Sequence, residues 1–508
     1  MAFSQKTIKK PIKMKKIKLL FILQIIAALI FSYEAVAKNQ ISDKSPSVFI
    51  PFQGDFADPT IVRDGKDFYL THTSYGYYPG LLIWHSTDLI HWKPICRALK
   101  TNVGEVWAPE MIIFNNKYYI YFPTDLGANY LITADNPRGP WSEPIKLDIQ
   151  GIDPGHIATA SGKRYLYVNR GRMSPLSNDG MSTTAKPQKL YDGWKYPSDW
   201  IVECFCLESP KLFQRNDFYY LVSAQGGTSG PSTSHMAVVA RSKSPEGPWE
   251  NSPINPLIHT YSNSEPLVSK GHATLFDDVK GNWWAIYHGY ENGYLPSGRN
   301  TLIEKVEWTN DGWPKVFGNK ATANQYHTIQ NYKTENDNFN ANDLKLQWVF
   351  SGLDSLSQFS IKNGSLQIIC NPTKTKALMC QPSDKNYEAI IKFSTQGVVS
   401  TGLTVFYDEK IFTGIEYDNH SIQSLIKAEK HLPKITAQDC KYLKMRIENY
   451  KLQLYWSSNG KKWIAYSESM DLSNYHTNNL HGFKNLKIGI IGKGNGTLLI
   501  DSFRYKKI

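Results

Sequence analysis

Three carboxylic acids occupy comparable places along this chain of 508 residues. Asp58 stands in GDFADPTIV, Asp153 in GIDPGH and Glu208 in LESPKLF, so a proline follows each acid at the first or second position. For a single Asp-Pro pair the simplest interpretation is a turn, in which the proline holds the preceding residue in an extended conformation. Three acids held in a similar way indicate instead that the carboxylates act together on one molecule.

Carboxylates that meet in this way could hydrolyse a glycosidic bond. One carboxylic acid protonates the leaving oxygen, while a carboxylate on the opposite side of the sugar activates a water molecule. A third carboxylate nearby raises the pKa of the acid, because like charges resist joint ionisation. The spacing in the sequence does not give the separation of the groups, so it leaves open whether the configuration of the sugar is inverted or retained.

A repeated pattern predicts the elements that carry these acids. A turn with Gly or Asn leads five times into an aromatic-rich strand, at intervals of about fifty residues and with almost no amphipathic-helix periodicity between the copies. The five copies are DGKDFYL, NNKYYIYF, SGKRYLYV, RNDFYYLV and KGNWWAIYH. We therefore predict a β-propeller of about four strands per blade over residues 38–325. Each acid precedes its copy by a similar distance, so all three should point to one end of the propeller axis.

The remainder of the chain predicts a second all-β domain. Residues 326–338 are polar and read as a linker, whereas residues 339–508 contain short alternating strands separated by polar turns. This pattern is typical of a β-sandwich.

The N-terminus has the features of a cleavable signal peptide. A lysine-rich stretch precedes the apolar run LLFILQIIAALIF, and the A-x-A sequence that ends at Ala37 predicts cleavage after this residue. The apolar run is too short to span a bilayer comfortably, so we expect residues 1–37 to be removed and the protein to be secreted or periplasmic, without membrane insertion. Residues 1–37 carry about half of the formal net charge of +12, and no basic stripe remains that would indicate nucleic acid as a partner.

Six cysteines in an exported protein permit disulfides, but their pairing cannot be deduced from the sequence. Cys204 and Cys206 bracket the approach to Glu208 and either form a disulfide that rigidifies this loop or are small buried residues. They lack a second pair at zinc-ligand spacing.

Several ordered motifs resemble glycoside hydrolase family 43. They are FADPTIVRDGKDFYL, SYGYYPGLLIWHSTDLIHW, WAPEMIIFNNKYYIYF, GIDPGH, LESPKLFQRNDFYYLVSAQGGT, KGHATLFDDVKGNWWAIYHG and SGRNTLIEKVEW, which run in order from about Phe52 to Trp308. The chain is most similar to the exo-acting β-xylosidases and α-L-arabinofuranosidases that carry a C-terminal β-sandwich of the concanavalin-like jelly-roll type. The resemblance implies the five-bladed propeller and an inverting mechanism.

The resemblance also implies roles for individual residues. Asp58 resembles the general base, Asp153 the group that tunes the pKa of the acid, and Glu208 the general acid. The residues that resemble the family's contacts to the terminal sugar are Tyr75, Trp107, Thr228, His272 and Arg299. No cofactor is required by this resemblance; it allows one structural calcium, for which His272 is the candidate contact, and otherwise predicts no metal site.

The sequence departs from the family pattern in three places; none removes a catalytic carboxylate, but the second and third leave the sugar open. Ser209 replaces the glycine that usually follows the acid, ATASG replaces an acidic turn after Asp153, and Tyr75 stands where xylosidases often have Phe. Our interpretation is an inverting exo-glycosidase that releases terminal β-D-xylose or α-L-arabinofuranose from oligosaccharides or polysaccharides of plant type. The alternatives are a β-galactofuranosidase of the same family and a glycan-binding propeller without catalysis. Glu110 is assigned to a turn or the surface, and His288 to a strand.

Overall fold

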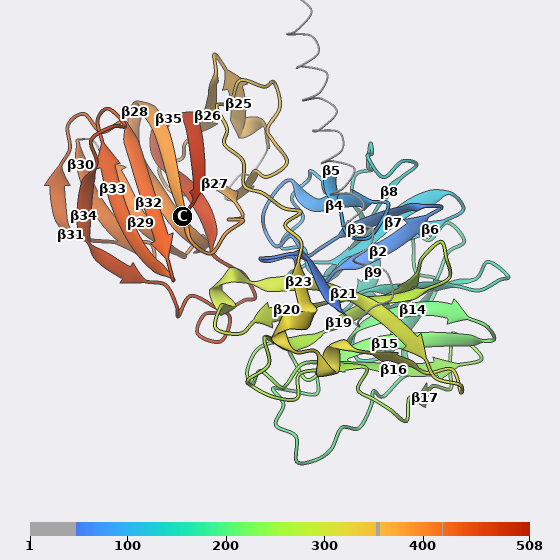
Figure 1. The fold of residues 1–508 in the computed structure, drawn as a ribbon. Coiled ribbons are helices and arrows are strands. Elements are labelled where there is room, and N and C mark those ends of the chain that lie inside the picture. The colour runs from blue at the N-terminus through green and yellow to red at the C-terminus, as the bar shows by residue number, and fades with distance from the viewer. Residues whose placement is uncertain (1–46, 352–355, 419) are drawn as a thin grey trace, which may run out of the picture. The chain divides into compact units, whose positions relative to one another are not determined.

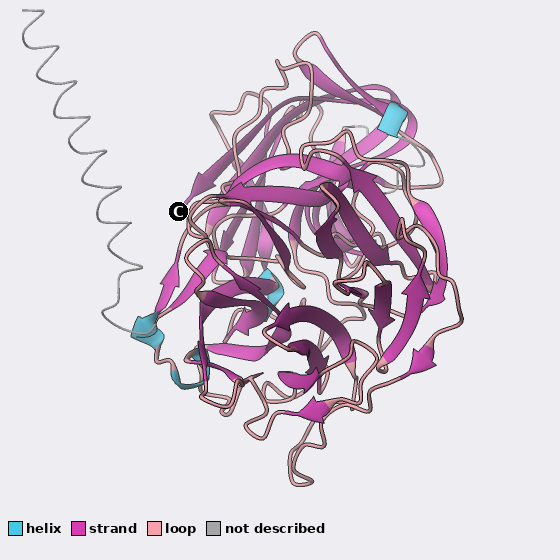
Figure 2. Cartoon of the chain, turned by 90° about the vertical axis from the view of Figure 1, so that its right-hand side faces the viewer, coloured by secondary structure: helices cyan, strands magenta, loops and turns pink. Residues whose placement is uncertain are grey.

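The computed structural model describes residues 47–351, 356–418 and 420–508, so the expected signal peptide lies outside the described residues. Strands and loops make up nearly all of this part of the chain, as Figure 2 shows, and its helices are short 3-10 turns. These turns are η1 (Leu295–Ser297), η2 (Gly318–Lys320), η3 (Ala323–Gln325) and η4 (Leu356–Gln358). The prediction of an all-β protein is therefore confirmed.

Four antiparallel sheets follow one another along the first half of the chain and form the first four blades of a propeller. The first blade contains β2 (Thr60–Asp64), β3 (Asp67–Thr71), β4 (Gly80–Ser86) and β5 (Lys93–Leu99). The second contains β6 (Glu110–Phe114), β7 (Lys117–Pro123), β8 (Ala128–Ala134) and β9 (Ile145–Gln150). The third contains β10 (Gly155–Ala158), β11 (Arg164–Val168), β12 (Arg172–Leu176) and β13 (Gln188–Lys189). The fourth contains β14 (Glu208–Arg215), β15 (Phe218–Gln225), β16 (Met236–Ser242), β17 (Glu250–Asn251) and β18 (Ile258–His259).

The fifth blade is built from both ends of the propeller segment. It contains β19 (Leu267–Asp277), β20 (Trp283–Glu291), β21 (Arg299–Trp308), β22 (Pro314–Val316), β1 (Val48–Phe52) and β23 (Tyr326–Thr328). Strand β1 pairs antiparallel with β21 and parallel with β23, so the N-terminal strand closes the last sheet. Strand β23 thus lies in a blade, although it falls within the range that the sequence predicts to be a linker.

The first strand of each blade lies nearest the propeller axis. These strands, β2, β6, β10, β14 and β19, contact one another in this order, and β19 contacts β2 to close the ring. Each predicted aromatic-rich repeat is the hairpin between the first and second strands of a blade. In the second blade Asn115 and Asn116 both have a left-handed φ, as a tight hairpin turn requires. The prediction of five blades is confirmed.

Twelve further strands form the β-sandwich. They are β24 (Val349–Ser351), β25 (Phe359–Lys362), β26 (Ser365–Ile369), β27 (Lys376–Cys380), β28 (Tyr387–Asp408), β29 (Ile411–Asp418), β30 (Ser421–Ile426), β31 (Glu429–Thr436), β32 (Tyr442–Glu448), β33 (Lys451–Ser457), β34 (Ile464–Asp471) and β35 (Lys487–Lys507).

Two long strands, β28 and β35, hold the sandwich together. They pair with each other along almost their whole length, and Figure 1 shows them side by side. One half of the pair continues into β29, β30 and β31 and the other half into β32, β33 and β34, so both layers share these strands. Alternate side chains of the two layers, such as Ile391, Leu443 and Ile490, meet in the core between them. The predicted β-sandwich is confirmed.

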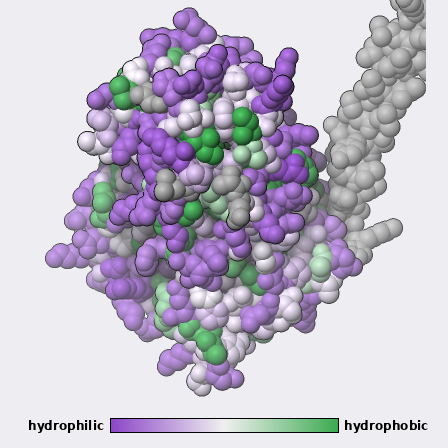
Figure 3. Space-filling model, turned by 90° about the vertical axis from the view of Figure 1, so that its left-hand side faces the viewer, coloured by the Kyte–Doolittle hydropathy of each residue, from purple (hydrophilic) through white to green (hydrophobic). Residues whose placement is uncertain are grey.

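Residues 47–508 form one compact unit, in which the propeller and the sandwich share an apolar cluster. This cluster joins Tyr75 and Tyr77 of the first blade to Val349, Met379 and Phe406 of the sandwich. The molecular face in Figure 3 is mostly hydrophilic, and its hydrophobic residues occur in small separate groups. Among the described residues, no helix has the length and apolar character needed to cross a membrane.

Candidate active site

The three predicted carboxylates lie at the same end of the innermost strands. Asp58 comes just before β2, Asp153 just before β10, and Glu208 is the first residue of β14. Asp58 and Asp153 are buried and Glu208 is half-buried. The imidazole of His272, on β19, joins two of them, because its Nδ1 lies 3.3 Å from Asp58 Oδ1 and 3.8 Å from Asp153 Oδ2. The structure therefore brings the acids of blades one, three and four together around the axis.

The backbone at two of these acids differs from the sequence prediction. Asp58 and Asp153 precede prolines and should be extended, yet each has a φ of 55°, in the left-handed region. An Asp tolerates this region better than most residues, but the conformation still costs free energy and has to be held by its surroundings. At Asp58 the surroundings are a set of hydrogen bonds to the carboxylate, which outweigh the local preference.

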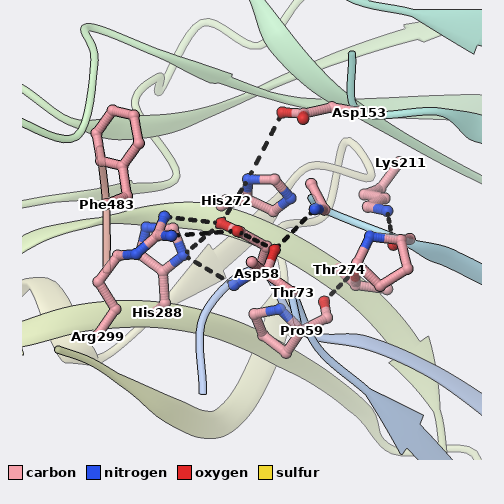
Figure 4. A network of polar contacts seen from close by, with 12 residues as sticks. Asp58, Pro59, Thr73, Asp153, Lys211, His272, Thr274, His288, Arg299 and Phe483 are labelled. Carbon is pink, nitrogen blue, oxygen red and sulfur yellow. Dashed lines mark hydrogen bonds and ion pairs between the residues drawn. The ribbon is translucent and has the colours of Figure 1, made fainter. Parts of the chain in front are cut away.

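Arg299 is the principal partner of Asp58. Its two terminal nitrogens donate to Asp58 Oδ1 at 2.9 Å and to Oδ2 at 3.3 Å, and the hydroxyl of Thr73 donates to Oδ2 at 2.6 Å. His288 Nδ1 lies 3.1 Å from Oδ1 and also accepts a hydrogen bond from the backbone N–H of Asp58. Figure 4 shows Asp58 at the centre of these partners.

These contacts keep Asp58 ionised. Burial by itself would raise the pKa of Asp58, but the Arg299 guanidinium is the main cause that holds this pKa well below its usual value. Burial lowers the pKa of His288 to about 4 and that of His272 well below its ordinary value, so both rings are neutral near pH 7. Arg299 is therefore the charged partner that stabilises the carboxylate.

The other two acids have the opposite tendency. Burial, followed by the charges of Asp153 and Asp58, raises the pKa of Glu208 well above its usual value. Burial and the charge of Asp58 also raise the pKa of Asp153, to about 7. The site thus combines one carboxylate that is stabilised as an anion with two that resist ionisation.

A close backbone approach brings the strands of Asp153 and Glu208 together. A Cβ added at Gly155 would lie 1.5 Å from the carbonyl oxygen of Pro210, so only glycine fits at this position of β10. Gly155 is two residues after Asp153, and Pro210 is two residues after Glu208. The GIDPGH motif therefore includes the residue that allows these two blades to approach each other.

Beneath the acids lies a buried ion pair that the sequence analysis did not identify. Lys211 Nζ donates to Glu110 Oε2 at 2.6 Å and to the carbonyl oxygen of Pro109 at 3.0 Å, and Thr60 donates to the same carboxylate oxygen. The side chains of Lys211 and Glu110 are 2% and 7% exposed. The assignment of Glu110 to a turn or the surface is therefore wrong, because β6 places it at the axis opposite a buried lysine. The charge of Lys211 also lowers the pKa of Asp153, although it does not outweigh burial.

The candidate sugar-contacting residues divide into two groups. Arg299, Tyr75 and His272 lie beside Asp58. Arg299 and His272 are next to the Asp58 carboxylate, and the Arg299 guanidinium also donates to the Tyr75 hydroxyl at 3.1 Å. Trp107 is half-buried and packs against the apolar cluster that contains Tyr75. Thr228 is buried in the loop after β15, the strand that pairs with β14 beside Glu208.

The sandwich contributes a residue to the same site. The carbonyl oxygen of Phe483, in the loop before β35, accepts a hydrogen bond of 2.6 Å from the Tyr75 hydroxyl. Its ring centroid lies 5.5 Å from the guanidinium carbon of Arg299, and Figure 4 shows the ring beside this arginine. At 41% exposure the Phe483 ring remains open to a bound molecule. The sequence could not have identified it, because a phenylalanine in a loop of a second domain carries no signal of its own.

The histidines on the axis do not form a good calcium site. Asp58, His272 and His288 could present one atom each to a metal ion. Calcium, however, takes about six to eight oxygen ligands, whereas two of these donors are nitrogens and the carboxylate already accepts from Arg299 and Thr73. Of these three residues, the buried atoms without a hydrogen-bond partner in the described part of the chain are His272 Nε2 and His288 Nε2, which are likewise nitrogens. The residues of this cluster therefore do not fit the calcium ion that the resemblance allows.

Cys204 and Cys206 form a disulfide, with 5.2 Å between their Cα atoms. This outcome corresponds to the first of the two alternatives that the sequence left open. The other four cysteines, Cys96, Cys370, Cys380 and Cys440, are free.

Two family comparisons cover most of the chain. The sequence model of the glycosyl hydrolases family 43 matches residues 50–314, and that of the beta xylosidase C-terminal concanavalin A-like domain matches residues 336–506. A non-reducing end alpha-L-arabinofuranosidase of Bacteroides ovatus is 32% identical over 348 residues, which cover 61% of this chain and 62% of the relative, less than two thirds of its length. A beta-xylosidase of Bacillus subtilis is 26% identical over 487 residues, which cover 80% of this chain and 88% of the relative.

Solved structures show the same architecture over nearly the whole length. The xylan beta-1,4-xylosidase of Bacillus halodurans superposes with a TM-score of 0.79 at 25% identity, covering 90% of this chain and 99% of the other. A family 43 protein from a xyloglucan locus of Bacteroides ovatus superposes with a TM-score of 0.75 at 25% identity, covering 91% of this chain and 100% of the other.

Fold, site and relatives therefore define a glycosidase of the five-bladed propeller class. Within that class, the chain belongs to the glycosyl hydrolases family 43.

Proposed function

We propose that this protein is an inverting exo-glycosidase that releases single pentose residues from the non-reducing ends of glycans. The observation that carries the proposal is the contrast in charge among the three acids. Arg299 stabilises Asp58 as an anion, whereas burial and neighbouring charge favour the protonated form of Glu208. A hydrolase that works by inversion needs one base and one acid in these states at the same pH.

Asp58 is the proposed base and Glu208 the proposed acid. Asp58 takes a proton from a water molecule as the water oxygen attacks the anomeric carbon. The bond from this carbon to the leaving oxygen breaks, its electron pair stays on that oxygen, and Glu208 supplies the proton. Burial and the charge of Asp58 keep Glu208 protonated, and Asp153 adds to this effect when it is itself ionised. The ion pair with Arg299 keeps Asp58 ionised. It also makes Asp58 a weaker base, because a carboxylate with a lower pKa binds a proton less tightly.

The surroundings of Asp58 support an action on one terminal sugar. Arg299 and Tyr75 offer hydrogen-bonding groups on one side, and the partly exposed Phe483 ring stands beside them. Arg299 Nε has no hydrogen-bond partner among the described residues, so its N–H is free to donate, and an aromatic ring packs on the apolar face of a sugar. The relatives named above include both an arabinofuranosidase and xylosidases, which supports α-L-arabinofuranose or β-D-xylose as the sugar.

A panel of nitrophenyl glycosides tests this proposal. We expect release of nitrophenol from the α-L-arabinofuranoside or the β-D-xyloside, at a higher kcat/KM than from the β-D-galactofuranoside. Proton NMR during the first minutes should show a released sugar with the anomeric configuration opposite to that of the substrate. Retention of configuration would contradict the assigned roles, and binding of all substrates without turnover would support a glycan-binding propeller instead.

We also propose that the protein acts outside the cytoplasm. The signal-like N-terminus supports this location, and so does the Cys204–Cys206 disulfide, because disulfides persist mainly in oxidising compartments. N-terminal sequencing of the protein from the culture medium or periplasm checks the predicted cleavage after Ala37.

A further inference from the structure

The segment just before Glu208 has a feature that the proposed mechanism does not use. Phe205, three residues before the proposed acid, has a large apolar side chain and is 41% exposed. The Cys204–Cys206 disulfide closes a small ring around it.

The backbone of this segment is hydrogen-bonded to the loop that follows β15, the strand paired with β14. Glu208 stands opposite Ala224 in the β14–β15 ladder. Beyond this pair, the N–H of Gly226 donates to the carbonyl oxygen of Phe205 at 3.3 Å, and the N–H of Glu203 donates to the carbonyl oxygen of Gly226 at 3.2 Å. These two hydrogen bonds fix residues 203–205 against Gly226, just after the end of β15 and close to the start of β14.

The disulfide ring packs tightly on the loop that carries Thr228. A Cβ added at Gly227 would lie 3.0 Å from Cys204 Sγ and 2.4 Å from Glu203 Oε2. The position of Phe205 is thus fixed relative to the loop that contains a candidate sugar contact.

Two residues lie close to the ring of Phe205. Its edge lies against Gly193, where an added Cβ would be 2.8 Å from Phe205 Cζ, and the ring of the half-buried Tyr196 lies 5.9 Å away at 30°. The remaining surface of the ring faces solvent. A flat ring that is held in this way can bind the apolar face of a sugar at a small cost in side-chain entropy.

We propose that Phe205, held by the Cys204–Cys206 disulfide and supported by Tyr196, binds the sugar on the leaving-group side of the scissile bond. This inference depends on the proposed role of Glu208. A general acid must contact the leaving oxygen, so the leaving sugar lies beside Glu208. Phe205 is three residues before Glu208 in the chain, on the segment that adjoins this position. The ligand is therefore the pyranose or furanose that carries the terminal pentose. Phe205 is a specificity residue for natural glycans and is not needed for bond cleavage itself.

The test compares two substrates that require the same proton but differ in the leaving group. One is a pentose-terminated oligosaccharide, and the other is the matching methyl pentoside, whose leaving group reaches no further than one carbon. For Phe205→Ala we expect kcat/KM on the oligosaccharide to fall about tenfold, as for the loss of one well-packed aromatic contact. The value on the methyl pentoside and the inhibition constant of free pentose should stay within about twofold of wild type.

Further variants separate recognition from a structural role. Phe205→Tyr should retain the oligosaccharide activity, whereas Phe205→Leu, which keeps apolar packing but removes the flat ring, should behave like Phe205→Ala. Cys204→Ser combined with Cys206→Ser should lower activity on the oligosaccharide alone. Trp463→Ala is the matched control. Trp463 is half-buried in the hairpin after β33 of the sandwich, and its loss should change the activity on neither the oligosaccharide nor the methyl pentoside.

An equal loss on both substrates, or full rescue by leucine, would show that Phe205 only shapes the loop and would overturn the inference. No loss on either substrate would overturn it as well. If wild-type protein cleaves neither substrate, the proposed function itself fails, which is a different result from a wild-type enzyme that Phe205→Ala leaves unchanged.

Discussion

Each acid of the site takes its properties from a few neighbours. Asp58 is paired with Arg299, whereas no hydrogen bond to the Glu208 carboxylate is present among the described residues, and burial together with the charges of Asp153 and Asp58 determines its behaviour. Two carboxylates of similar chemistry in one hollow thus acquire different protonation states from their surroundings alone.

This difference predicts the pH dependence of the reaction. Glu208 has to be protonated to act, and because its pKa is raised, kcat/KM should fall only as the pH rises through that elevated pKa. Asp58 has to be ionised, and because its pKa is lowered, activity should persist into acid until the fold itself is lost. A pH–rate profile with an oligosaccharide substrate checks this, and an acid limb near the usual pKa of an aspartate would contradict it.

Glu208→Gln should remove the basic limb of that profile. We expect kcat on the oligosaccharide to fall by about 10²–10⁴, the usual contribution of a general acid. A dinitrophenyl pentoside, whose leaving group needs no proton, should lose far less. Glu307→Gln, at an exposed carboxylate of the fifth blade, is the control and should match wild type on both substrates. Equal losses on the two substrates would show that Glu208 is not the acid.

At the scale of elements, the innermost strands determine where the acids lie. Each acid stands at the start of such a strand, and the strands contact one another around the axis. At the β10–β14 contact the two backbones are so close that a Cβ added at Gly155 would lie 1.5 Å from the carbonyl oxygen of Pro210. The positions of Asp153 and Glu208 therefore depend on the absence of a side chain at Gly155.

Gly155→Ala tests this dependence. The added methyl group cannot fit, so β10 and β14 must separate, and we expect a large loss of kcat together with a lower Tm. The control is Gly65→Ala, where an added Cβ meets nothing within 4 Å and only the left-handed φ, at about 1 kcal/mol, opposes the change. Wild-type activity in Gly155→Ala would show that the spacing of these strands does not matter for catalysis.

The sequence predicted the elements better than it predicted the contacts around the acids. The five hairpins, and the equivalent positions of Asp58, Asp153 and Glu208 before them, follow from local turn and strand preferences. These preferences appear in the sequence as a repeated pattern. Local preference gave the wrong backbone at Asp58, because distant side chains hold its carboxylate. The sequence analysis missed the Lys211–Glu110 pair and Phe483 for a related reason. Each contact joins strands or domains that are far apart in the chain, and no short sequence motif predicts such a contact.

At the scale of the whole molecule, the sandwich is part of the site. The Tyr75 hydroxyl receives a hydrogen bond from Arg299 and donates one to the carbonyl oxygen of Phe483, so the arginine that holds Asp58 is linked to the second domain. Tyr77 likewise donates to the carbonyl oxygen of Tyr407 at 2.7 Å, and Lys484 pairs with Glu105 at 2.5 Å.

Deleting the sandwich should therefore impair the active site itself. The truncated chain would end after Thr328, so that it retains β23. We expect it to expose the shared apolar cluster, bind a hydrophobic dye such as ANS, and show a higher KM and a lower kcat than the full chain. Light scattering and kinetics on the soluble fraction provide the measurement. A soluble truncated protein with unchanged kinetics would contradict a role of the sandwich in the site.

The closure of the fifth blade by β1 has a consequence for biosynthesis. Phe49 pairs with Ile303, so the first described strand has to wait for almost the entire propeller segment before it finds its partner. Pairings this distant in sequence make folding slow. Arg299 lies on β21, and so a nascent chain that has produced only four blades contains all three acids but not the cation that holds Asp58. The ion pair that holds Asp58 can therefore form only after the last blade has been synthesised.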